Sequence, residues 1–157
     1  MLEIVVVLLL MSILAATVIG RSITTSNLDL PSATDKIRNQ IRYAQAQAMK
    51  RSDTIWGIQS DSAIRQYWLF RASASGAEEV VIPGGDYASG GTRIGFTALG
   101  ADLNSFTLVF DRFGRPFNGH INGVPNNPVA PGDNPKITVK KGEEAPITIT
   151  PETGLVR

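Results

Sequence analysis

The sequence contains no cysteine and only one histidine. Without cysteine there are no disulfides, thiolate metal sites or cysteine nucleophile, so the core must be held by packing alone. His120 lies in a stretch rich in glycine and asparagine, where we expect a solvated loop side chain. No serine stands in a Gly-x-Ser-x-Gly sequence, the pattern of the α/β-hydrolase nucleophile. These absences favour a protein that is not an enzyme.

A charge excess of either sign is also missing. Fifteen Lys and Arg residues against fourteen Asp and Glu residues give a formal net charge of +1, so the whole molecule is not drawn strongly to nucleic acid or anionic membrane. Asp102, Asp111 and Asp133 do not have the spacing of a calcium loop. Residues 85–92 have the outline of a phosphate-binding loop, but Gly91 stands where the lysine should be. We therefore expect no metal and no cofactor.

The longest hydrophobic run lies near the N-terminus, where residues 4–19 carry no charge. As a helix this run is about 24 Å long, slightly less than the ~30 Å hydrocarbon layer of a bilayer. It can be read as a cleaved secretory signal, a plain membrane anchor, or a segment that leaves the membrane to pack against copies of itself. A secretory signal has basic residues ahead of the run, whereas here Glu3 precedes it and Arg21 follows. For a plain anchor, the basic residues after the run would place that side in the cytoplasm.

Glu3 at the front of the apolar run has two interpretations. If Glu3 lies at the water interface, the free-energy cost of placing its carboxylate there is small, and the positive end of the helix dipole stabilises the negative charge. Inside the apolar layer a carboxylate costs about 2.5 to 3.5 kcal/mol on insertion scales, so it would need a partner such as the terminal amine of a neighbouring copy. The stretch alone favours neither.

A kink or break is predicted near residues 20–31, because this stretch is polar and ends at Pro31, which disfavours helix for the residue before it. Residues 31–52 then predict an amphipathic helix. Its apolar face repeats at spacings of four, three and four and consists of Ile37, Ile41, Ala44 and Ala48.

From Thr54 onward the pattern is that of short strands, rich in β-branched and aromatic residues and separated by Gly, Pro, Asn and Asp. Residues 105–117 are the clearest hairpin, with the turn at residues 111–114. Residues 118–136 hold four prolines and predict a long exposed loop. The pattern favours a compact β-sandwich or strongly bent sheet. The predicted strands are residues 54–60, 64–72, 78–83, 92–98, 105–111, 136–140, 145–150 and 154–156.

The stretch LEIVVVLLLMSILAATVI resembles the N-terminus of the type IV pilin and type II secretion pseudopilin superfamily. Mature chains of that superfamily carry a glutamate at the fifth position, which Glu3 matches if two residues and a short basic leader precede this sequence. The other possibility is that Met1 is itself the processed, methylated N-terminus, with Glu3 two positions earlier than in the superfamily pattern. The resemblance implies an α+β fold, in which a long helix with an apolar first half and an amphipathic second half packs on an antiparallel β-sandwich-like domain.

Three segments follow from this resemblance: residues 1–20 as a transmembrane or filament-core helix, residues 21–52 as its kinked continuation, and residues 53–157 as the β domain. The implied function is a structural subunit of a type II secretion pseudopilus or type IV pilus. It would be a single-pass protein of the bacterial inner membrane, with the β domain in the periplasm or on an extracellular filament. Its implied partners are other pilin or pseudopilin subunits, the inner membrane and, if a leader exists, prepilin peptidase. Glu3 would set the axial register of the filament.

YAQAQAMKRSDTI and the ending ITITPETGLVR are similar to one branch of the superfamily, the minor pseudopilins of the H type and the FimT minor pilins. FimT-type pilins are implicated in DNA uptake through a C-terminal motif of glycine, arginine, any residue and arginine. Here Leu155 replaces the first arginine, so the motif does not carry over intact.

The resemblance to this branch still implies an alternative function: a minor pilin at a filament tip that binds DNA or another ligand for uptake or adhesion. Four basic residues are candidates for weak nucleic-acid contacts: Lys136, Lys140, Lys141 and Arg157. Three nearby acids oppose them: Glu143, Glu144 and Glu152.

Overall fold

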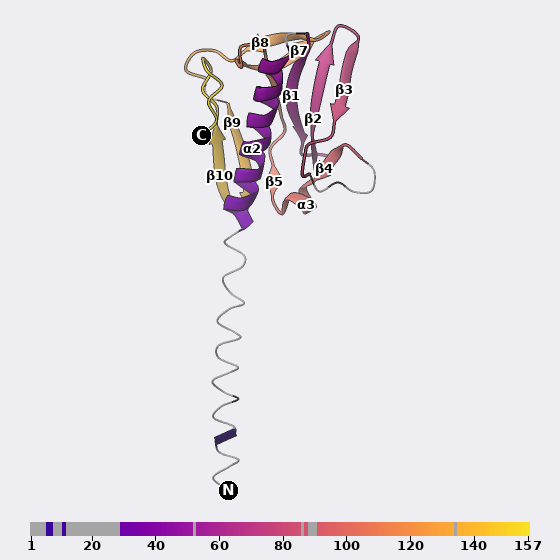
Figure 1. The fold of residues 1–157 in the computed structure, drawn as a ribbon. Helices are drawn as coiled ribbons and strands as arrows, with labels where there is room; N and C mark the ends of the chain where they lie inside the picture. The colour runs from indigo at the N-terminus through magenta and orange to yellow at the C-terminus, as the bar shows by residue number, and fades with distance from the viewer. Residues whose placement is uncertain are drawn as a thin grey trace.

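The computed structural model describes residues 6–7, 11, 29–51, 53–85, 87, 91–133 and 135–157. It contains the helix α2 (Asp29–Lys50) and two antiparallel sheets (Figure 1). The predicted α+β class is confirmed. Met1 and Glu3 lie outside the described residues, and so does most of the predicted break between the two helical segments. The long N-terminal helix stays a prediction.

Helix α2 is held in the domain by the apolar face that the sequence predicts. Ile37, Ile41, Ala44 and Ala48 are all fully buried, and the helix contacts strands of both sheets. The small alanine side chains let the helix backbone approach the strands closely. Pro31 lies in the first turn, where its missing N–H costs no helical hydrogen bond.

The larger sheet has seven antiparallel strands in the order β3-β2-β1-β6-β7-β8, with β4 paired to β2 beyond the end of β3. Its strands are β1 (Ile55–Asp61), β2 (Gln66–Ser73), β3 (Gly76–Val80), β4 (Arg93–Gly95), β6 (Phe106–Phe110), β7 (Pro116–Ile121) and β8 (Val124–Pro128). At its centre Gly57 of β1 pairs with Phe70 on one side and Val109 on the other.

The smaller sheet has three strands in the order β10-β9-β5. They are β5 (Asp102–Leu103), β9 (Lys136–Lys141) and β10 (Glu143–Thr148). The C-terminal residues extend its edge through a bridge between Ile149 and Val156. One hydrophobic core joins the inner faces of both sheets to α2, so the helix lies between the two sheets (Figure 1).

The predicted loop at residues 118–136 is wrong in its first half, because β7 and β8 form a hairpin there. Asn122 and Gly123 form its two-residue turn, both with positive φ, as a type I′ turn requires. Pro125 and Pro128 are tolerated because β8 is an edge strand. The Asn-Gly pair is the sequence signal that could have revealed this hairpin.

Two smaller strand predictions also need correction, and one strand was not predicted. Residues 92–98 form only the short strand β4, after which Phe96–Leu99 turn as the helix α3. Residues 154–156 contribute one bridge rather than a strand. Strand β5 was not predicted, because two residues are too few to show a pattern.

The β7–β8 hairpin covers part of the outer face of the larger sheet. Its turn packs against β2, where a Cβ on Gly123 would lie 2.3 Å from the backbone of Ser73. His120 of β7 stacks on Phe70 with the ring centroids 5.4 Å apart. The expectation of a solvated loop histidine is therefore wrong: His120 is half-buried in a strand. This contact lies beside a second, smaller apolar cluster that includes Phe70 and Phe117.

Tyr67 on the inner face of β2 predicts a loss of stability at alkaline pH. Its side chain is fully buried, and burial raises its pKa to about 12, an effect that the nearby Gln40 side chain reduces. In the unfolded chain a tyrosine ionises near pH 10. The stabilising effect of keeping Tyr67 neutral in the fold is therefore fully present below pH ~10 and is lost as the pH rises towards about 12.

We expect Tyr67→Phe to remove this part of the pH dependence. At pH 7 the change should alter stability by about 1 kcal/mol or less, because the buried hydroxyl makes no well-formed hydrogen bond and has only the Gln40 side chain nearby. Urea unfolding at pH 8 and pH 11 measures both effects. If the free energy of unfolding falls by the same amount from pH 8 to pH 11 in the wild type and in the variant, Tyr67 does not cause the loss of stability at alkaline pH.

Candidate functional site

The structure separates the four predicted nucleic-acid contacts into two pairs. Lys136 lies opposite Thr148 in the β9–β10 register, and Thr148 exchanges two backbone hydrogen bonds with Arg157, of 3.1 and 2.9 Å. Because directly opposed residues of antiparallel strands share a face, Lys136 and Arg157 flank Thr148 on one face of the smaller sheet. Both side chains are exposed.

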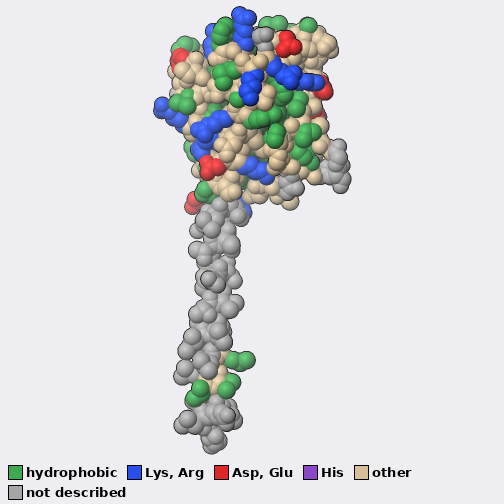
Figure 2. Space-filling model, in the orientation of Figure 1, with side chains coloured by type: hydrophobic (Ala, Val, Ile, Leu, Met, Phe, Trp, Pro, Cys, Tyr) green, Lys and Arg blue, Asp and Glu red, His purple; other side chains and the backbone are tan. Residues whose placement is uncertain are grey.

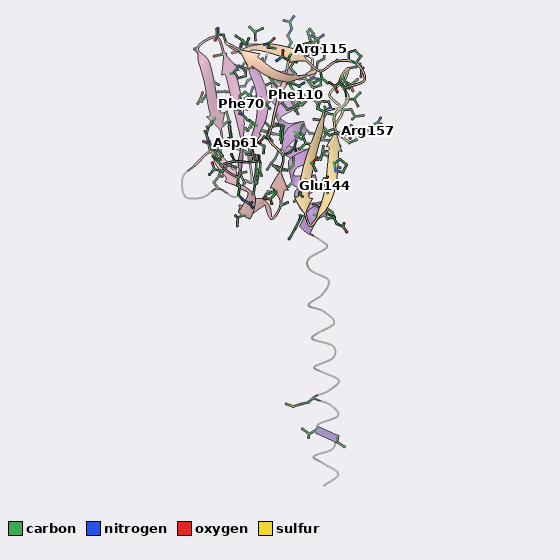
Figure 3. All side chains as sticks on the ribbon, turned by 180° about the vertical axis from the view of Figure 1, so that it is seen from behind. Asp61, Phe70, Phe110, Arg115, Glu144 and Arg157 are labelled. Atoms are coloured by element: carbon green, nitrogen blue, oxygen red, sulfur yellow. The ribbon has the colours of Figure 1, made fainter. Side chains whose placement is uncertain are left out.

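Lys140 and Lys141 lie at the other end of β9, beside the turn into β10. They face Glu144 and Glu143 in the strand register, and Lys140 forms an ion pair with Glu144. Figure 3 shows Arg157 and Glu144 well apart along this sheet. The four basic residues therefore do not form one patch, and the pair near the turn has acids directly opposite.

Two residues of α2 reach the C-terminal segment, and sequence reasoning missed both. Arg42 Nη2 donates a hydrogen bond of 3.1 Å to the carbonyl of Val156. Gln45 Nε2 donates to the carbonyl oxygens of Gly114 and Thr153, at 2.9 and 3.1 Å. Gln45 thereby joins the helix, the β6–β7 turn and the C-terminal segment. These contacts join residues far apart in sequence, so only the folded chain shows them.

A mixed apolar and basic surface lies at the end of the domain where α2 stops and the β7–β8 hairpin crosses (Figure 1). We call it the distal surface. Of the ten exposed large hydrophobic residues that the structure describes, three belong to the N-terminal run and four of the other seven lie here. The distal surface consists of Met49, Lys50, Arg51, Arg112, Phe113, Ile121 and Val124.

Contacts place several of these residues together, and Lys50 and Arg51 directly follow Met49 in the chain. Met49 lies beside the β6–β7 turn, since a Cβ on Gly114 would be 3.1 Å from its sulfur. Ile121 and Val124 face each other across the hairpin. Figure 2 shows hydrophobic and basic side chains side by side at this end of the domain.

The distal surface contains an open cavity of about 390 Å³. Phe113 and Arg112 form part of its wall, and the hairpin contributes Val124. Ile55 and Phe117, from the ends of β1 and β7, add further apolar surface. Asp53 also lines the cavity. The cavity wall is therefore mixed: apolar side chains share it with two carboxylates and two guanidinium groups. The acids in the wall oppose a phosphate, whereas the apolar side chains can contact an apolar group of a ligand.

The β6–β7 turn is held rigidly by Asp111, which is 7% exposed. Its carboxylate accepts hydrogen bonds from the backbone N–H groups of Phe113 and Arg115, both at 2.9 Å, and from Arg115 Nε at 2.8 Å. The Phe113 ring lies close to two guanidinium groups, with its centroid 4.8 Å from Cζ of Arg112 and 5.3 Å from Cζ of Arg115. The predicted hairpin with its turn at residues 111–114 is confirmed. The sequence did not predict that this turn would expose the aromatic ring of Phe113.

No group of three or more His, Asp or Glu side chains among the described residues could hold a metal ion. None of the helices within the described part of the chain is long and apolar enough to cross a membrane. No protein-family model matches the sequence, and comparison with curated proteins and with solved structures gives no significant match. The candidate site is therefore defined by its own geometry.

Proposed function

We propose that the protein is a pilin-like structural subunit, held in the bacterial inner membrane by its apolar N-terminal segment and assembled through that segment into a secretion pseudopilus or a pilus. One observation carries the proposal. Val6, Val7 and Met11, the described residues of the apolar run, are helical and 49%, 53% and 67% exposed. Their apolar side chains are not covered by the β domain, and they belong to a run of sixteen uncharged residues, 4–19. Both facts favour coverage of this segment by lipid or by other protein chains.

The proposed action is physical rather than catalytic. The apolar segment and α2 act as one pilin-type helix, whose first half lies in lipid and whose second half is fixed in the β domain. During assembly the first half exchanges lipid for the helices of neighbouring subunits. Because its apolar surface is covered in both environments, the exchange costs little hydrophobic stabilisation. The β domain then faces outward from the filament.

We expect Glu3→Ala to leave membrane association intact and to abolish incorporation into filaments. The proposed reason is that Glu3 pairs with the terminal amine of a neighbouring subunit and so sets the axial register. Membrane fractionation and recovery of the subunit from sheared filaments measure the two properties. Glu152→Ala, which removes an exposed carboxylate of the β domain, is the matched control. Normal incorporation of the Glu3 variant would contradict the register role.

A second candidate function, recognition of a ligand at a filament tip, is favoured by the distal surface. Phe113 is exposed and lines the cavity. Its turn packs beside Met49, which lies at the end of α2, so this site is at the end of the domain opposite the start of that helix. In a pilin-like arrangement this end would point away from the membrane. It would be open to partners in the last subunit of a filament.

A further inference from the structure

The composition of the distal surface is that of a protein-binding surface. Phe113, Ile121 and Val124 are 63%, 60% and 64% exposed, and Met49 is 52% exposed. Phenylalanine, methionine and arginine are enriched where proteins meet, and the residues that dominate binding cluster around fully desolvated pockets. Here an aromatic ring and two arginines line a cavity of about 390 Å³, and Met49 lies beside the turn that carries them.

The positive charge of the distal surface favours an acidic partner. Lys50, Arg51 and Arg112 have no ion pair within the described residues, whereas Arg115 is paired with Asp111 at 2.7 Å. The carbonyl groups at the C-terminal end of α2 partly offset the positive charge of Lys50. Asp53 is the one carboxylate of the cavity wall that has no ion pair in the described structure. A net positive charge therefore remains on the distal surface, which also holds the exposed apolar side chains and the cavity.

This arrangement fits a protein segment better than a nucleic acid. Nucleic-acid binding depends on many cations arranged to follow a row of phosphates. The unpaired cations here are few, and exposed apolar side chains and Asp53 lie among them. The cavity wall of Ile55, Phe117 and Val124 offers apolar contacts that a phosphate cannot use.

We infer that the distal surface binds an acidic protein segment, which inserts an apolar side chain into the cavity beside Phe113 while its carboxylates meet Arg112, Arg51 and Lys50. The inference goes beyond the filament function and does not depend on it, because it concerns only the folded domain. The surface is formed before binding. Asp111 fixes the β6–β7 turn, and the contact between Gly123 and Ser73 fixes the hairpin, so little ordering is needed when the partner arrives.

The test uses the full chain in detergent and a labelled nine-residue peptide, in which a Leu-Phe pair is flanked by glutamates on both sides. We expect saturable binding by fluorescence anisotropy. Arg112→Glu and Phe113→Ala should each weaken it at least tenfold, and added salt should weaken it as well. Both side chains are exposed, so neither change should disturb the fold. Circular dichroism checks this.

Two control variants and two control peptides sharpen the test. Ile64→Ala removes an exposed apolar side chain and Lys136→Glu reverses an exposed charge, both outside the distal surface, and neither should alter peptide binding. A peptide with lysines in place of the glutamates, and one with glycines in place of the Leu-Phe pair, should each bind at least tenfold more weakly than the acidic peptide.

Several results would overturn the inference: no saturable binding of the acidic peptide, equal binding of the lysine peptide, or unchanged binding by the Arg112 and Phe113 variants. Tighter binding of a single-stranded oligonucleotide, lost in the Arg112 variant, would make the surface a nucleic-acid site instead. The experiments distinguish failure of this inference from failure of the proposed filament function. The distal variants should still enter filaments, and Glu3→Ala should still bind the peptide.

Discussion

Replacing Gly154 by alanine is expected to lower the free energy of unfolding by about 3 kcal/mol. Gly154 has φ of +65°, a conformation that costs other residues roughly 1–2 kcal/mol. A Cβ there would also lie 2.3 Å from the carbonyl oxygen of Gly114 and 2.5 Å from Gln45 Nε2. Both atoms belong to the hydrogen bond by which Gln45 joins α2 to the β6–β7 turn, so neither is free to move aside.

Thermal and urea unfolding measure this effect, which corresponds to a fall in Tm of roughly 10 °C for a domain of this size. Gly142→Ala is the matched control. Gly142 has φ of +76° but no atom within 4 Å of the added Cβ, so it should lose only the conformational part, about 1 kcal/mol. Equal losses in the two variants would show that the close approach of Gly154 to Gly114 contributes nothing.

Asp111→Ala is expected to destabilise the protein by about 2 to 3 kcal/mol. The change leaves the backbone N–H groups of Phe113 and Arg115 without their acceptor and removes the carboxylate partner of Arg115. A buried donor that loses its partner costs about 1–3 kcal/mol. The Arg115 side chain is 54% exposed, so water takes over much of its charge and limits the loss. Urea unfolding at neutral pH measures the effect.

Asp111→Asn separates the two contributions of this carboxylate. The amide keeps one oxygen, which accepts the backbone hydrogen bonds, but it loses the charge that pairs with Arg115. We expect a loss of about 1 kcal/mol, since an exposed ion pair contributes little. A loss as large as that of the alanine variant would mean that the ion pair, rather than the acceptor, holds the turn.

The sequence revealed the elements whose side chains alternate between buried and exposed positions. The α2 face with Ile37 and Ile41 follows from a helical repeat, and the hairpin at residues 105–117 follows from two apolar strands around a turn. The β7–β8 hairpin was missed, because its polar, proline-containing strands lack such alternation. Its pairing depends on backbone hydrogen bonds and on the Asn-Gly turn, which are less visible in the amino-acid pattern.

The candidate site could not be predicted in the same way. Met49, Phe113 and Val124 belong to a helix end, a turn and a hairpin, and nothing in their sequence spacing places them together. They meet because β7 and β8 continue beyond β6 and pack across the end of β2, with Gly123 against Ser73. That contact depends on how the sheet bends, which is decided by packing between distant segments.

By itself the sequence determined the apolar N-terminal run with Glu3 before it, the α+β class and the buried face of α2, because local hydrophobic patterns fix which surfaces must leave water. Only the tertiary structure decided that Lys136 and Arg157 lie apart from Lys140 and Lys141, and that the distal surface exists. Strand register and the bending of the sheet set those distances, and both arise from contacts between residues far apart in the chain.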